Sequence, residues 1–171
     1  KSPIHEERLL SLLIFMLKFR KADSAQKRMI CQAYLKYSRY INNWDLVDLS
    51  AGHILGAFLA DKDRGTLYKL ANSASLWERR IAMVSTFYFI KNNDFKDTLK
   101  IARILIADRH DLIHKAVGWM LREVGKRDQA LEEKFLKQYS HQMPRTMLRY
   151  AIERFPPGKR QVYLRVSREK A

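Results

Sequence analysis

Two charged side chains interrupt rows of apolar residues that helical periodicity would bury. The first row reads Trp44, Asp48, Ala51, Leu55 and Phe58, and the second reads Leu76, Arg80, Met83, Phe87 and Ile90. A carboxylate buried alone is costly, so Asp48 is expected to be paired, hydrogen-bonded or used in chemistry. If Arg80 is its partner, Asp48 stays ionised at neutral pH. A purely structural ion pair is the alternative, and periodicity alone treats Trp44 as a core residue.

A second candidate surface combines an aromatic ring with cations at helical spacing. It reads Lys115, Trp119, Arg122 and Lys126, beside a core stripe of Leu112, Ala116, Val117, Met120 and Val124. A ring that stacks and cations that meet phosphate suit a nucleic-acid backbone. An edge-of-core tryptophan beside solvated cations is the alternative. Arg145 and Arg149 extend the basic character, and the final 31 residues hold 8 basic and 2 acidic side chains.

Several other chemistries lack their residues. The sequence has no Walker loop and no G-x-G-x-x-G motif. His110 and His114 stand four apart but lack the glutamate of the metalloprotease motif and a third ligand, so no metal is expected. Cys31 has no nucleophile context, so it is treated as a buried apolar residue. We expect no metal and no cofactor.

Composition points to a basic helical protein. The 171 residues include 33 Lys plus Arg and 18 Asp plus Glu, a formal charge of +15, which favours a polyanionic partner. Gly (6) and Pro (4) are scarce, which favours an all-α fold. The longest apolar stretch, 9–17, is too short to span a bilayer. With one cysteine and no signal peptide, the chain is expected to be a soluble monomer in the cytoplasm, associated with the nucleoid if it is bacterial.

The elements that position these residues follow from periodicity, caps and breakers. Helices are expected over 4–20, 25–40, 44–60, 65–71, 76–91, 95–107, 111–126, 128–139, 144–154 and 161–168. The first is expected to bury Leu9, Leu12, Leu13, Met16 and Leu17. Leading helices start near residues 3, 44, 76, 110 and 143, at intervals of 41, 32, 34 and 33 residues. Such intervals predict one repeat domain over 1–171, an α-solenoid of HEAT-like helix pairs; an irregular helical bundle is the alternative.

Three blocks resemble, in order and spacing, the DNA alkylation repair glycosylases of the AlkD type. They are 43–48 (NWDLVD), 77–82 (WERRIA) and 115–123 (KAVGWMLRE), and 145–152 (RTMLRYAI) looks more loosely like the last repeat of that family. The resemblance implies a right-handed HEAT-like solenoid with a concave basic surface. It also implies that family members carry further helices ahead of Lys1, so that this chain, which opens Lys1-Ser2-Pro3, is a fragment.

The resemblance also implies an activity, the excision of N3- and N7-alkylated purines from duplex DNA. It places the catalytic aspartate at Asp48, the functional tryptophans at Trp44 and Trp119, and an arginine at Arg80. Lys115, Arg122, Lys126, Arg145 and Arg149 are the expected DNA contacts. The implied enzyme is a monofunctional glycosylase that leaves the lesion stacked and uses no cofactor. A non-catalytic HEAT-like module that binds damaged or branched DNA is the first alternative, and a protein-binding scaffold is the second.

Overall fold

A computed structural model describes residues 2–166 of the chain, and these residues contain helices, turns and loops but no strand. The prediction of an all-α fold is therefore confirmed. The chain groups into two compact units, Lys1–Phe89 and Ile90–Ala171. One repeat domain over 1–171 stays a prediction, as do the right-handed twist and the concave basic surface. The basic segment expected at 161–168 ends in residues that lie outside the described part.

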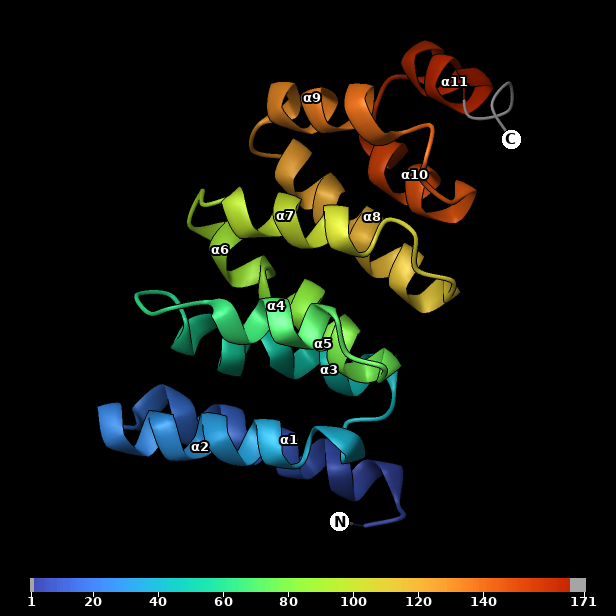
Figure 1. Cartoon of the computed structure of the whole chain (residues 1–171). Helices are drawn as coiled ribbons and strands as arrows, with labels where there is room; N and C mark the ends of the chain where they lie inside the picture. The colour runs from blue at the N-terminus through green and yellow to red at the C-terminus, as the bar shows by residue number, and fades with distance from the viewer. Residues whose placement is uncertain (1, 167–171) are drawn as a thin grey trace. The chain divides into compact units, whose positions relative to one another are not determined.

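The first unit consists of two helix pairs and a further leading helix (Figure 1). Its elements are α1 (His5–Lys21), α2 (Ser24–Lys36), a 3₁₀ turn (Ser38–Tyr40), α3 (Trp44–Ala51), a π-helical turn (Gly52–Gly56), α4 (Gly65–Ala71) and α5 (Leu76–Ser85). Polar side chains fix where these helices begin. Asp23 and Gln26 form a capping box at α2, and the Asn43 side chain accepts the Trp44 N–H at 2.8 Å at α3.

The second unit repeats this organisation. Its elements are α7 (Lys96–Ile104), α8 (Asp111–Gly125), α9 (Gln129–Tyr139), α10 (Arg145–Ala151), a 3₁₀ turn (Ile152–Arg154) and α11 (Pro157–Val166); the short α6 (Phe87–Lys91) carries the chain from one unit to the other. Asp128 caps α9 by accepting the Leu131 N–H at 2.8 Å. The expected leading helices are all present and begin at His5, Trp44, Leu76, Asp111 and Arg145. Antiparallel pairs thus recur at the predicted interval, as in HEAT-like repeats.

Successive leading helices within a unit run parallel and approach closely at a glycine. In the first unit a Cβ at Gly56 would overlap the carbonyl oxygen of Ser85 on α5. In the second unit a Cβ at Gly118 would overlap the Met147 carbonyl oxygen and lie 2.5 Å from the Cβ of Tyr150 on α10. Only glycine permits this backbone-to-backbone contact. The two glycines therefore fix how the helices that carry the candidate site residues pack.

Several expected helices differ in detail from the structure. The helix expected over 44–60 contains the π-helical turn, in which the Ala57 N–H reaches back to the Gly52 carbonyl. The helix expected over 76–91 is interrupted at Thr86, whose N–H and hydroxyl both bond the Met83 carbonyl. The last helix begins at Pro157 rather than at residue 161. A proline suits the first turn of a helix because its missing N–H has no partner to lose there.

The apolar face expected on the first helix is wrong in part. Leu12 and Phe19 are buried, but Leu13 and Leu17 are exposed, together with Leu10, Ile14 and Met29 on the same helix pair. The pair α1 and α2 lies at the end of the described stack, so only one of its faces meets another pair. Periodicity identifies the apolar residues of such a helix but not which of them a neighbour covers.

Candidate functional site

Asp48 and Arg80 form a bidentate ion pair between the parallel helices α3 and α5. Arg80 Nε donates to Asp48 Oδ1 at 2.9 Å and Nη2 donates to Oδ2 at 2.7 Å. The Arg80 side chain is only 5% exposed, whereas Asp48 retains 19%. The partnership expected from the two interrupted rows is therefore confirmed. Because each carboxylate oxygen has more than one lone pair, Asp48 can still accept a further hydrogen bond from its exposed side.

The surroundings of Asp48 act on its proton affinity in opposite directions. Burial raises the pKa of Asp48 above the ordinary aspartate value, and the nearby Asp45 carboxylate adds to the rise. The hydrogen bonds and charge of Arg80 oppose it. A fixed carboxylate that is partly desolvated, ion-paired and open on one side can stabilise positive charge that develops next to it.

The first turn of α3 presents an aromatic ring beside this pair. Trp44 is 53% exposed, so the placement of Trp44 in the core by periodicity is wrong. Trp44 is the first residue of α3 and lies four residues before Asp48, on the same helix face. Next to it, His5 Nε2 and Asp45 Oδ2 are 2.8 Å apart, which ties α1 to the start of α3. Neither residue is marked as a candidate in the sequence, so this contact was not predicted.

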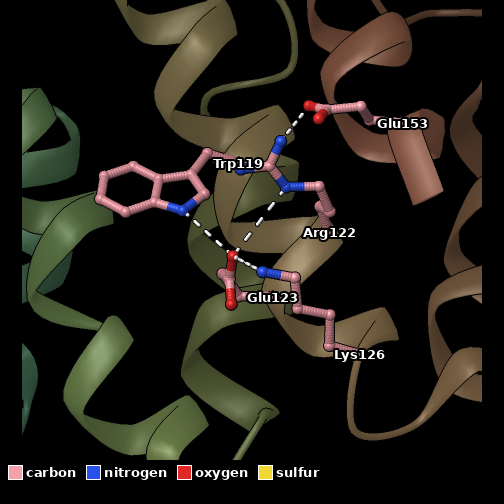
Figure 2. A network of polar contacts seen from close by, with 5 residues as sticks. All are labelled: Trp119, Arg122, Glu123, Lys126 and Glu153. Atoms are coloured by element: carbon pink, nitrogen blue, oxygen red, sulfur yellow. Dashed lines mark hydrogen bonds and ion pairs between the residues drawn. The ribbon is translucent and has the colours of Figure 1, made fainter.

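The second unit holds the other predicted tryptophan within a polar network on α8 (Figure 2). Trp119 Nε1 donates to Glu123 Oε1 at 3.2 Å, and Lys126 Nζ donates to the same oxygen at 2.6 Å. Arg122 Nε lies 3.9 Å from that oxygen, and Arg122 Nη1 donates to Glu153, which follows α10. Two of the expected DNA contacts, Arg122 and Lys126, therefore already neutralise carboxylates.

The three remaining expected DNA contacts differ in their exposure and in the partners that they already have in the structure. Lys115 pairs with Asp111 at 2.7 Å one turn earlier on α8. Arg145 is exposed and donates to the carbonyl of Leu164 at 3.1 Å. Arg149 is exposed and lines a pocket of about 410 Å³ in the second unit. The other residues that line this pocket are Thr146, Tyr150, Glu153 and Arg160.

Arg160 is a basic residue that sequence analysis did not single out. It lies on α11 and faces the same pocket as Arg149, and its Nε is buried without a hydrogen-bond partner among the described residues. Two guanidinium groups at one pocket form a site that suits an anion such as phosphate. The high density of basic residues near the C-terminus was the available signal, but periodicity did not assign Arg160 to a helix face.

A family model of DNA alkylation repair enzymes matches residues 1–155. The chain belongs to the DNA alkylation repair enzyme family. The match contains every site residue expected from the sequence, and it ends before α11 and Arg160. No curated protein matches the chain significantly.

For a member of this family, the predicted site residues form two groups, one in each unit. The first unit brings together Trp44, Asp48 and Arg80 on α3 and α5, and the second carries Lys115, Trp119, Arg122, Lys126, Arg145 and Arg149 on α8 and α10. None of the helices between residues 2 and 166 is long and apolar enough to cross a membrane.

Proposed function

We propose that this DNA alkylation repair family member is a DNA glycosylase that hydrolyses the N-glycosidic bond of N3- and N7-alkylpurines in duplex DNA. The observation that carries the proposal is the Asp48–Arg80 pair, which fixes a carboxylate with one open side next to an exposed tryptophan. Family membership supplies DNA alkylation damage as the substrate class.

The chemistry of the lesion explains why one fixed carboxylate is enough. Alkylation at N3 or N7 makes the purine cationic, so the base leaves with the electron pair of the C1′–N9 bond and becomes neutral. Positive charge then develops on the deoxyribose, as in glycoside hydrolysis. Asp48 stabilises that charge or orients the attacking water, whose oxygen bonds C1′ and whose proton passes to the carboxylate or to solvent. The products are a free alkylpurine and an abasic site.

Arg80 and the tryptophans support this role in different ways. An unpaired carboxylate in a DNA interface would repel the phosphates, and the Arg80 charge offsets that repulsion. Trp44 and Trp119 each supply an electron-rich ring face of the kind that attracts a cationic sugar. In the second unit, Arg149 and Arg160 hold a backbone phosphate at their shared pocket. The enzyme is expected to act as a monomer and to use no metal or organic cofactor. It is expected to act in the cytoplasm, at the nucleoid if it is bacterial.

The proposal is tested by release of 7-methylguanine and 3-methyladenine from methylated duplex DNA, compared between the parent and Asp48→Asn. Release should fall by about 10² to 10³ while DNA affinity holds or rises. Because Asp48→Asn leaves Arg80 buried without a charged partner, the double variant Asp48→Asn/Arg80→Met is measured too, with circular dichroism as the check of folding. Asp61→Asn, an exposed aspartate of the same unit, is the matched control.

If the parent binds duplex DNA but releases neither base, the catalytic proposal fails. The non-catalytic module that binds damaged or branched DNA then takes its place. In that case the Asp48–Arg80 pair is a structural ion pair between two helices, and its removal changes the free energy of unfolding alone.

A further inference from the structure

Glu123 is a buried carboxylate at the centre of the network on α8. Its side chain is only 8% exposed, and a single oxygen, Oε1, accepts the Trp119 indole N–H at 3.2 Å and the Lys126 ammonium at 2.6 Å. Figure 2 shows the six-membered ring of Trp119 directed away from the pair formed by Arg122 and Glu153, with the indole nitrogen turned toward Glu123. The carboxylate thus anchors one edge of the half-buried indole.

The spacing of the two residues makes this contact local to one helix. Trp119 and Glu123 are four residues apart on α8, so their side chains lie on one face. A tryptophan side chain can occupy several rotamers, and a hydrogen bond to a carboxylate favours the one that points the N–H at the acceptor. The Glu123 acceptor is itself buried and bonded to Lys126.

We propose that Glu123 is a positioning residue that holds the Trp119 indole in the orientation in which it meets the lesion nucleotide. The inference rests on the proposed function for the identity of that nucleotide. Lys126 and Arg122 have a supporting role here, because their charges make a buried carboxylate tolerable beside polyanionic DNA. These two cations, which the sequence marks as phosphate contacts, therefore help to hold the Glu123 carboxylate in place.

Two substitutions separate the acceptor from the charge. Glu123→Gln keeps a carbonyl oxygen that can accept the indole N–H and loses the negative charge, whereas Glu123→Leu loses both at similar volume. The two variants thus share any effect of charge on DNA affinity. Single-turnover release of 7-methylguanine at saturating enzyme should fall by about 10- to 100-fold in Glu123→Leu and stay near the parent value in Glu123→Gln. Glu133→Ala removes another carboxylate of the second unit, paired with Lys159, and is the matched control.

A spectroscopic measurement follows the indole itself. The chain contains three tryptophans, so 5-fluorotryptophan labelling should give three fluorine resonances, and Trp119→Phe assigns the one from Trp119. Glu123→Leu should shift that resonance and leave those of Trp44 and Trp77 in place, and Glu123→Gln should shift it much less. The spectra are recorded for the free protein and with a duplex that contains a tetrahydrofuran abasic analogue.

The outcomes distinguish this inference from the proposed function. Equal release rates for the two Glu123 variants, or a Trp119 resonance that Glu123→Leu leaves unchanged, overturn the positioning role. If the parent releases no base, the glycosylase proposal fails, and the duplex titration decides the inference. A duplex-induced shift of the Trp119 resonance that survives in Glu123→Gln and is lost in Glu123→Leu supports it. The same shift in parent and Glu123→Leu overturns it.

Discussion

Glu132→Gln is expected to make the stability of the protein less sensitive to pH. Glu132 lies on α9 with 1% of its surface exposed, and it packs against Gly125, where any side chain would overlap its carboxyl group. Its Oε1 has no hydrogen-bond partner among the described residues. Burial raises the pKa of Glu132 from 4.5 to about 8; the charge of Glu133 adds to the rise and that of Arg122 opposes it.

The direction and size of the effect follow from proton linkage. Below pH 4.5 both the folded and the unfolded chain hold the proton, so the carboxyl carries no penalty. Between pH 4.5 and 8 the unfolded chain releases it and the folded chain keeps it, so the free energy of unfolding falls by about 1.36 kcal/mol per pH unit. The loss is about 3 kcal/mol at pH 7 and levels off near 5 kcal/mol above pH 8. Glutamine does not titrate, so the free energy of unfolding of the variant does not show this loss.

Urea unfolding followed by circular dichroism at 222 nm, for parent and Glu132→Gln at each pH from 5 to 9, measures the effect. The difference between the two proteins removes the contributions of all other titrating groups. We expect that difference to move by about 3 to 4 kcal/mol in favour of the variant between pH 5 and 8. A difference that stays constant over this range would mean that the folded state holds Glu132 with an ordinary pKa, and the reasoning would be refuted.

Three further changes test the site and its scaffold. Because burial raises the pKa of Asp48, the acid limb of a single-turnover rate profile should have its midpoint above the ordinary aspartate value of 3.8; a midpoint at or below 3.8 contradicts this. Gly118→Ala should lower the free energy of unfolding by about 1 to 3 kcal/mol in thermal or urea melts, whereas Gly158→Ala, at an open position, should not. Arg149→Ala and Arg160→Ala should each lower the slope of log affinity against log salt by about 1 for duplex DNA, and an unchanged slope places the phosphate elsewhere.

Much of the first unit's candidate site was predictable because its anomalies lie in regular helices. Asp48 and Arg80 each break an apolar row, and a buried charge of one sign in one repeat and of the other sign in the next implies a pair. The exposure of Trp44 was not predictable from periodicity, because a helix row does not record which of its residues a neighbour covers. Leu13 and Leu17 show the same limit at the end of the described stack.

The polar network of the second unit could be predicted only in part. The row of Lys115, Trp119 and Arg122 is visible in the sequence, but the carboxylates that engage it were not identified: Asp111 and Glu123 lie one turn away on α8, and Glu153 follows α10. Glu123 is next to Arg122 in the chain, and only the packing of α8 buries it. Glu153 lies 31 residues after its partner Arg122. Glu153 is exposed and interrupts no apolar row, so the sequence carries no sign of this pair of the kind that marks Asp48 and Arg80.

The π-helical turn after α3 takes up one residue more than a continuous α-helix would hold there. A π turn accommodates one residue more than an α turn, and each residue turns an α-helix by about 100°. Because the wider turn absorbs the additional residue, the half that carries Asp48 and the half that packs through Gly56 both face α5. If residues 52–56 closed into an α turn, the Asp48 carboxylate would rotate by about 100° away from Arg80 while the contact at Gly56 stays in place. The reach of Asp48 toward its partner is in this sense set by the width of one helical turn as much as by residue type.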